Sequence, residues 1–185
     1  MGRTSRDATA PARAGLPRLR TVAPEPRVQE PRVPEPRVPA PPPLPQAEYD
    51  AIYSRVPRLT VEVVAVSTAG VLLVRRTSGP CRGLWNLPGG TVRYGETLVD
   101  AVKRAALDEV GVTVQVGRLL GTIEYPSHLE QGIDWPIGIA FEVHLDAEGR
   151  RHLEPDGTTV AWFTEVPDEM HREQQDFLRA HGFAS

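Results

Sequence analysis

Hydrophobic and polar positions after residue 45 alternate in ways that predict a succession of strands and helices. β-Branched and apolar runs bounded by turn residues predict strands over 59–67, 71–76, 112–123, 136–145 and 160–163. Apolar residues at helical spacing predict helices over 47–55, 97–110 and 169–181. Gly79-Pro80 and Gly83 predict a loop over 77–87. A central helix among strands, with another helix near the C-terminus, predicts an α+β fold with α/β/α sandwich layering.

The first 45 residues have a different composition from the rest. They hold 12 of the 19 prolines and eight Arg against four acidic residues, and Glu-Pro-Arg-Val recurs with a period of five. Proline fixes φ and removes backbone donors, so we expect residues 1–45 to form a disordered tail. The sequence leaves open whether this tail binds a protein partner through its proline-rich end or has no function of its own. Residues 46–185 suffice for one folded domain.

Charge and composition narrow the classes of function. The net charge of −3 combines a tail of +4 with a domain of −7, and such an acidic domain argues against a dedicated nucleic-acid binder. No apolar run approaches the 18 residues of a membrane span. The single Cys81 excludes an internal disulfide and a cysteine-rich zinc site. We therefore expect a cytoplasmic protein with no membrane or nucleic-acid partner, and a homodimer is left open.

Candidate chemistry is concentrated around a double glycine and the helix that follows it. Gly89 and Gly90 predict a turn that allows close backbone approach, and a carbonyl in such a turn can coordinate a hard cation. Glu96 precedes the helix, where the dipole favours a carboxylate. Asp108 and Glu109 lie near the helix end and can direct two carboxylates to one place. Mg²⁺ suits such a site because it binds few carboxylates together with waters and phosphate oxygens.

The segment from residue 90 to 112 resembles the signature of the Nudix hydrolases. That signature is a Gly, five residues, a Glu, seven residues, then Arg-Glu-apolar-x-Glu-Glu-x-Gly-apolar. The positions in register are Gly90, Glu96, Arg104, Ala106, Glu109, Gly111 and Val112. Asp108 replaces one Glu of the signature, and Ala105 replaces another. Residues 83–90 are similar to the G-x-W-x-x-P-G-G approach of the family, and the likeness extends over about residues 59–165.

Membership would imply metal-dependent hydrolysis of a nucleoside diphosphate linked to another group, on a mixed sheet between helices. The substrate would be a nucleotide-derived small molecule, and the cofactor would be Mg²⁺, with Mn²⁺ as the alternative. The metal ligands implied by position are Gly90, Glu96, Asp108 and Glu109. Glu109 and Asp108 would be catalytic, together with Arg104, which would orient carboxylates within the helix.

A stretch from residue 76 to 98 is also similar to the GDP-mannose hydrolase subgroup of the family. By that likeness Arg76 would bind a phosphate and Glu62 would contact the nucleotide. The catalytic His of the subgroup belongs in the loop before Trp162, where this chain has Asp156-Gly157-Thr158-Thr159. The candidates for a replacement base are Glu124, His128, Glu130, Asp134, Glu142, His144 and Asp156.

Two features keep alternatives open. His128 stands out among the candidate bases because Glu124 and Glu130 flank it in the sequence, and a carboxylate neighbour can tune its pKa. Ala105 can neither bind Mg²⁺ nor accept a proton. The alternative to an enzyme is therefore a catalytically impaired Nudix-fold module that binds nucleotides or regulates.

Overall fold

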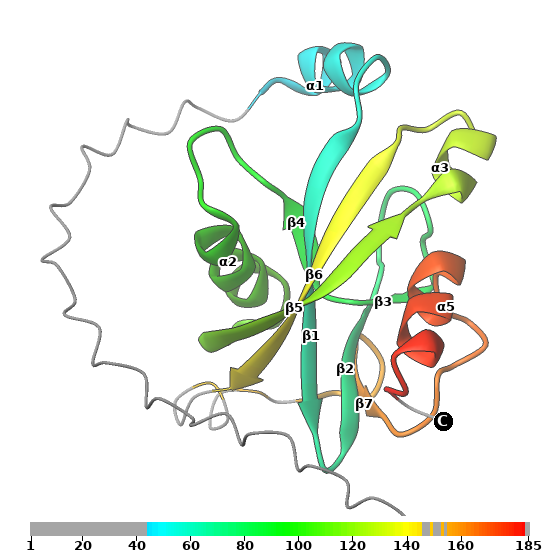
Figure 1. Cartoon of the computed structure of the whole chain (residues 1–185). Helices are drawn as coiled ribbons and strands as arrows, with labels where there is room; N and C mark the ends of the chain where they lie inside the picture. The colour runs from blue at the N-terminus through cyan, green and yellow to red at the C-terminus, as the bar shows by residue number, and fades with distance from the viewer. Residues whose placement is uncertain (1–43, 146–148, 150–152, 154, 184–185) are drawn as a thin grey trace, which may run out of the picture. The chain divides into compact units, whose positions relative to one another are not determined.

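The computed structural model describes residues 44–145, 149, 153 and 155–183 (Figure 1). The tail predicted for residues 1–45 lies, up to residue 43, outside the described residues. The elements in chain order are α1 (Gln46–Tyr53), β1 (Arg58–Ser67), β2 (Gly70–Arg75), β3 (Trp85–Asn86), β4 (Gly89–Thr91), α2 (Leu98–Val110), β5 (Val114–Glu124), α3 (Pro126–Glu130), β6 (Pro136–Leu145), β7 (Val160–Phe163) and α5 (Arg172–Ala180). Across the described ranges, no helix is long and apolar enough to cross a membrane.

The strands form a mixed sheet in the order β3-β2-β1-β6-β5, with β4 also paired to β1 and β7 to β2. β1 runs parallel to β6, and the other pairings are antiparallel. The first half of β1 lies between β6 and β4, and its end pairs with β2. β1 is therefore the strand through which both parts of the sheet are joined.

Helices cover both faces of this sheet, which confirms the predicted α/β/α layering. Figure 1 shows α2 and α5 on opposite sides of β1. Val61 and Val63 pack with the buried alanines of α2, whereas Val64 packs with Phe177 and Leu178 of α5. Successive side chains of a strand point to opposite faces, so β1 is buried on both. Full burial of one such valine contributes roughly 1.5–3 kcal/mol.

The central helix, predicted over 97–110, is observed as α2. Thr97 caps its first turn by accepting a hydrogen bond from the Asp100 backbone N–H at 3.1 Å. Gly111 ends the helix in a left-handed conformation, with φ of 69°. Its buried face is made of small residues, which lets the helix lie close to β1 and β4.

Three local predictions differ from the structure, because hydrogen bonding to distant segments overrides local signals. The double glycine is not a free turn but part of β4, with Gly90 opposite Val61 of β1. The predicted loop over 77–87 contains Trp85 and Asn86 of β3, which pair with β2. The closing helix begins at Arg172, not at residue 169. The reason is that the Glu169 carbonyl accepts from the Trp85 backbone N–H and the His171 backbone N–H donates to the Trp85 carbonyl.

Candidate functional site

Arg104 and Glu96 form a half-buried ion pair between α2 and the loop before it. Arg104 donates to both carboxylate oxygens of Glu96, from Nε at 2.7 Å and from Nη2 at 2.9 Å. Glu96 also accepts from the backbone N–H of Arg93 at 2.9 Å. These hydrogen bonds lower the pKa of Glu96 and raise that of Arg104. Both oxygens of Glu96 are engaged, which favours a supporting role for this residue over direct metal binding.

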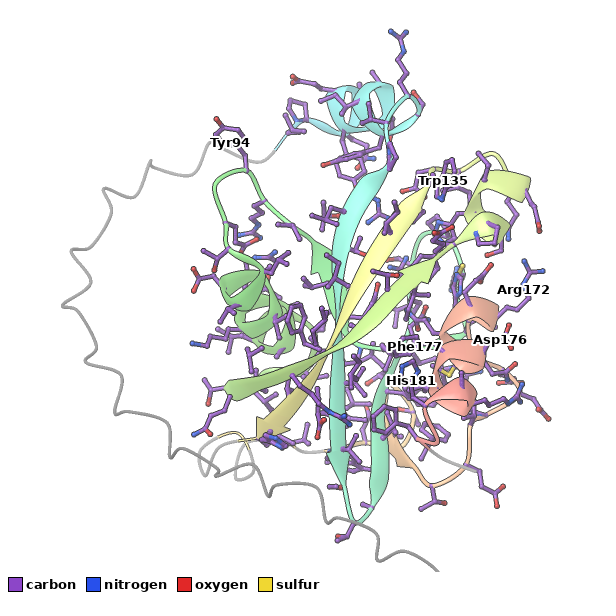
Figure 2. The ribbon with its side chains drawn as sticks, in the orientation of Figure 1. Tyr94, Trp135, Arg172, Asp176, Phe177 and His181 are labelled. Atoms are coloured by element: carbon purple, nitrogen blue, oxygen red, sulfur yellow. The ribbon has the colours of Figure 1, made fainter. Side chains whose placement is uncertain are left out.

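The same arginine ties α2 to β4. Its Nη2 donates to the Thr91 carbonyl at 2.9 Å, next to Gly90. The loop between β4 and α2 carries Tyr94, whose side chain is 77% exposed and points away from the sheet (Figure 2). The signature segment is therefore one unit of strand, loop and helix held by Arg104.

The two acidic residues at the end of α2 have different surroundings. Asp108 lies 3.4 Å from Arg104 Nη1 and 3.9 Å from Arg93, and its side chain is 51% exposed. Glu109 instead lines a cavity with Glu62, Arg76 and the Gly89 backbone. Partial burial raises the pKa of Glu109, and the positive charge of Arg76 opposes this.

Ala105 is buried beside β4. A Cβ atom built on Gly90 would lie 3.7 Å from Arg104 Nη1 and 3.9 Å from the methyl group of Ala105. The missing side chain of residue 90 thus leaves its backbone facing α2. The methyl group of Ala105 occupies the place where the signature has a Glu.

Glu62 is a buried carboxylate that the sheet encloses. Its Oε1 accepts from the Tyr125 hydroxyl at 2.8 Å and the Thr60 hydroxyl at 3.0 Å. A Cβ on Gly89 or on Gly138 would come within 2.6 or 2.7 Å of its oxygens, so both positions need glycine. Burial raises the pKa of Glu62 from 4.5 to about 7, although these hydrogen bonds and nearby arginines oppose the change.

Glu62 belongs to the inner cavity, a space of about 50 Å³ that Arg76, Glu109 and His128 also line. An outer cleft of about 500 Å³ lies beneath α1 and shares Arg58, Arg76 and His128 with the inner cavity. Pockets for small ligands usually measure about 300–1,000 Å³, so the outer cleft has the size of such a pocket and the inner cavity does not. A third cleft, around Val66 and Trp162, contains one of the sequence candidates, His144, and none of the predicted metal or substrate ligands.

His128 is the predicted candidate base that the structure brings into the inner cavity. It is 6% exposed, and its Nδ1 lies 2.7 Å from Asp134 Oδ1. Its carboxylate neighbour is therefore Asp134, and not Glu124 or Glu130, whose side chains are exposed. Burial acts to raise the pKa of Asp134, but hydrogen bonds from His128 and Arg58 lower it.

The remaining candidate bases lie elsewhere or have structural partners. Glu142 accepts from Arg118 at 2.6 Å on the edge of the sheet. Asp156 accepts hydrogen bonds from the Thr159 hydroxyl and from the backbone N–H groups of Thr158, Thr159 and Val160. These four hydrogen bonds, that of the hydroxyl first, lower the pKa of Asp156. It therefore shapes the turn before β7. His144 is exposed on β6 and faces the third cleft.

Three residues of the site were not among the sequence candidates. Tyr125 binds Glu62, and Gln174 donates to both Glu62 at 3.3 Å and Tyr125 at 2.9 Å. His171 lies next to His128, with ring centroids 5.3 Å apart. A tyrosine at a strand end and two polar residues at the start of a helix carry no local signal that would identify them.

Comparisons with known proteins agree with this arrangement. The NUDIX domain family model matches residues 56–180. The low-salt glycan biosynthesis protein Agl8 of Haloferax volcanii is 44% identical over 107 residues, which cover 56% of this chain and 69% of Agl8. The ADP-ribose pyrophosphatase of Methanocaldococcus jannaschii is 34% identical over 76 residues, which cover 41% of this chain and 45% of that protein.

Solved structures give the same assignment. The MutT NUDIX hydrolase of Burkholderia pseudomallei superposes with a TM-score of 0.54 at 25% identity, covering 66% of this chain and 96% of that one. The family model covers more than half of the chain, and the signature segment folds as one strand, loop and helix. This chain therefore belongs to the Nudix family of hydrolases.

Proposed function

We propose that this protein hydrolyses a nucleoside diphosphate linked to another group, in a reaction that requires Mg²⁺ and accepts Mn²⁺. The observation that carries this proposal is the position of Glu109. The last acidic residue of the signature, on α2, lines the same cavity as Glu62 of β1 and Arg76, which directly follows β2. The carboxylate of Glu109, the guanidinium of Arg76 and the protonatable Glu62 lie in one cavity. Such a combination suits an anionic substrate that binds together with a metal ion.

The residues present fit a hard divalent cation. Glu109, Asp108 and the Gly90 carbonyl offer the oxygen donors that Mg²⁺ prefers, and we propose that they hold the ion. The ion pairs of Asp108 are long and half-exposed, so this side chain is free to turn toward a ligand. Arg104 and Glu96 keep α2 and β4 in register, which is a positioning role. When bound, the ion would neutralise phosphate charge and lower the pKa of a water molecule.

Arg76 is the proposed phosphate ligand. It lies where the inner cavity and the outer cleft meet, so a phosphate bound there leaves the outer cleft for the rest of the substrate. The outer cleft is lined by Tyr49 and Tyr53 of α1, whose ring centroids are 4.6 Å apart. Aromatic faces at this position support binding of a base or a sugar ring.

Glu62 is the proposed nucleotide contact. With a pKa of about 7 it exists in both protonation states at neutral pH, and so it can donate or accept a hydrogen bond. A nucleotide sugar is the substrate class that we favour. Support comes from the likeness to the GDP-mannose hydrolase subgroup around Arg76 and from a relative named for glycan biosynthesis.

The test is a substrate panel followed by phosphorus NMR in ¹⁸O-labelled water. Nucleotide sugars, dinucleotides and nucleoside triphosphates are incubated with the purified chain and either Mg²⁺ or Mn²⁺. We expect metal-dependent release of a nucleotide from a nucleotide sugar, and the labelled product identifies the bond that breaks. Binding measured by calorimetry without product over hours would contradict the proposal and favour the binding module. A cytoplasmic location, a homodimer and a partner for the tail stay predictions.

A further inference from the structure

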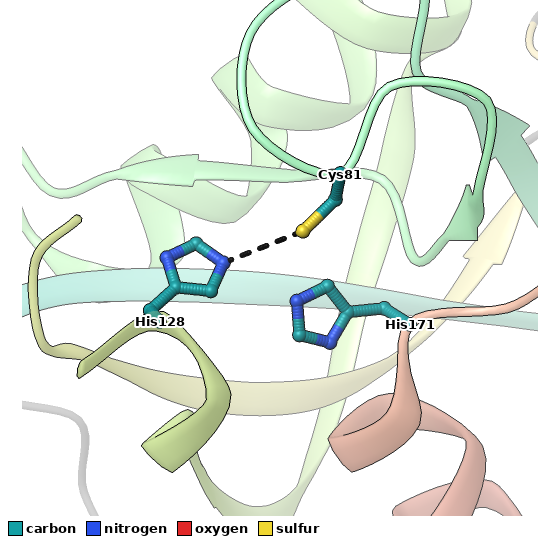
Figure 3. Close-up of side chains that lie close together, drawn as sticks. All are labelled: Cys81, His128 and His171. Carbon is teal, nitrogen blue, oxygen red and sulfur yellow. Dashed lines mark hydrogen bonds between the residues drawn. The ribbon is translucent and has the colours of Figure 1, made fainter. Parts of the chain in front are cut away.

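Cys81, His128 and His171 converge from three distant parts of the chain. Cys81 lies in the loop between β2 and β3, His128 in α3, and His171 directly before α5. One donor atom from each residue lies within 4.8 Å of the other two. Figure 3 shows one ring nitrogen of each histidine turned toward the space that the Cys81 sulfur also faces. Both imidazoles are buried, with 6% and 4% exposure.

The separation of the donor atoms fits a metal ion between them. The sulfur of Cys81 lies 3.7 Å from Nε2 of His128. Zinc bonds of about 2.3 Å to sulfur and about 2.0–2.1 Å to nitrogen, at a tetrahedral angle, place these two donors about 3.6 Å apart. The observed distance is that of a weak hydrogen bond to sulfur, and it also matches the edge of such a tetrahedron.

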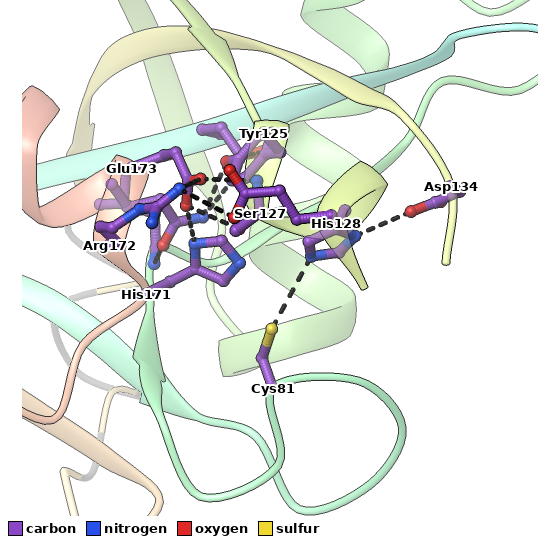
Figure 4. Close-up of polar contacts among 12 residues, drawn as sticks. Cys81, Tyr125, Ser127, His128, Asp134, His171, Arg172 and Glu173 are labelled. Atoms are coloured by element: carbon purple, nitrogen blue, oxygen red, sulfur yellow. Dashed lines mark hydrogen bonds and ion pairs between the residues drawn. The ribbon is translucent and has the colours of Figure 1, made fainter. Parts of the chain in front are cut away.

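Each histidine has a carboxylate behind it. Asp134 Oδ1 lies 2.7 Å from Nδ1 of His128, which keeps the proton on that nitrogen and leaves the lone pair of Nε2 facing Cys81. Glu173 Oε2 lies 3.0 Å from Nδ1 of His171 (Figure 4). A carboxylate on the outer nitrogen of each ring is the usual support of metal-binding histidines.

Other interactions explain the cluster only in part. Nδ1 of His171 is buried without a well-aligned hydrogen bond to any residue that the structure describes, and Glu173 lies beside it as an ion-pair partner. Cys81 has φ of 63°, the one positive φ of a non-glycine residue in the described part of the chain. Such a conformation is disfavoured and persists only where its surroundings impose it. The chain thus brings a thiol and two imidazoles together at one point, and among the described residues one weak hydrogen bond, between Cys81 and His128, joins their donor atoms.

We propose that Cys81, His128 and His171 bind a zinc-class divalent cation, separate from the Mg²⁺ site at the end of α2. One thiolate and two imidazoles are soft and borderline donors, which select Zn²⁺ over Mg²⁺. Three protein ligands leave a fourth position, and the two histidines line the inner cavity, so this position faces the cavity. Nε2 of His128 then binds a metal and is not available as a general base.

The experiment uses the full chain, stripped of metal and titrated with Co²⁺. We expect one equivalent to bind with a thiolate-to-cobalt charge-transfer band and the intense d–d bands of a four-coordinate ion, and Zn²⁺ to displace it. Cys81→Ser removes the charge-transfer band, and His171→Gln weakens binding about tenfold or more. Two controls keep wild-type spectra: His144→Gln, an exposed histidine, and Glu109→Gln. The second control separates this site from the proposed Mg²⁺ site.

A second readout needs no substitution, because Cys81 is the only cysteine of the chain. One equivalent of Zn²⁺ is expected to slow alkylation of Cys81 about tenfold or more, whereas excess Mg²⁺ leaves the rate unchanged. Cobalt spectra without a sulfur band, or equal alkylation rates with and without Zn²⁺, would overturn the proposal. Neither result depends on whether the protein hydrolyses a nucleotide.

Discussion

Arg104 binds both carboxylate oxygens of Glu96 across the loop that joins β4 to α2, at 2.7 and 2.9 Å. The two side chains are 19% and 12% exposed, so water screens this pair only partly. Arg104 also donates to the carbonyl of Thr91 and lies close to Gly90. One ion pair thus fixes the loop, the strand and the helix that together carry the proposed metal ligands.

Glu96→Gln should lower the free energy of unfolding by about 1.5–3 kcal/mol, the usual value of hydrogen bonds to charged groups. The matched control is Glu142→Gln, because Glu142 pairs with Arg118 at 2.6 Å but Arg118 is 72% exposed. That exposed pair should contribute about 0–1 kcal/mol. Urea denaturation of both variants measures the difference. Equal losses would show that the Arg104–Glu96 pair has no special structural weight.

The raised pKa of Glu62 makes stability depend on pH. The pKa is about 7 in the folded protein against 4.5 ordinarily, so this stabilising contribution is complete below pH 4.5 and is lost as pH rises to about 7. The loss amounts to about 3 kcal/mol. Glu62→Gln cannot ionise, so its stability relative to wild type should improve by about that amount between pH 4.5 and pH 8.

Urea denaturation at several pH values tests this expectation, with Glu165→Gln as the control at an exposed position. The control should follow the wild-type pH dependence. A Glu62→Gln curve that runs parallel to wild type across this range would mean that Glu62 is ionised normally in the folded protein.

Ala105→Glu restores the signature at a site that is 1% exposed and close to Gly90. Without metal, the new carboxylate is buried, and we expect the protein to lose about 2 kcal/mol or more of stability. Mg²⁺ should recover much of this loss if the ion binds between α2 and β4. The neighbouring Ala106→Glu is the control, because Ala106 is 0% exposed and belongs to the core. Thermal unfolding with and without Mg²⁺ compares the two, and equal recovery in both variants, or none in either, would contradict the proposed location.

The sequence predicted the central helix and five of the seven strands that the structure describes, all except β3 and β4, because their signals are local. Thr97 and Gly111 mark the ends of α2, and the apolar spacing between them marks its buried face. The signature then placed Arg104 and Glu109 on that helix. Local signals failed at Gly89-Gly90, where glycine indicated a turn but pairing with β1 made a strand.

The rest of the site depends on contacts between distant segments. Cys81 and His128 are 47 residues apart, one in the loop between β2 and β3 and the other in α3, so no spacing rule identifies them. Asp134 was one of seven candidate bases, and only the fold shows that it supports His128 and binds Arg58 at 2.6 Å. Because side chains alternate along β1, Glu62 lies on the opposite face of the sheet from Val61 and Val63. The sequence does not show that this face is buried, because Tyr125 and Gln174, which cover Glu62, come from distant segments.

The most direct test of the central claim is the Mg²⁺ dependence of hydrolysis in wild type, Glu109→Gln and Glu165→Gln. Loss of a metal-binding carboxylate should lower kcat/KM for a nucleotide sugar by about a hundredfold or more and raise the Mg²⁺ concentration needed for half-maximal rate. Glu165→Gln makes the same chemical change on the exposed surface and should behave as wild type. Wild-type turnover that chelation leaves unchanged would contradict the account. So would turnover by Glu109→Gln equal to that of wild type.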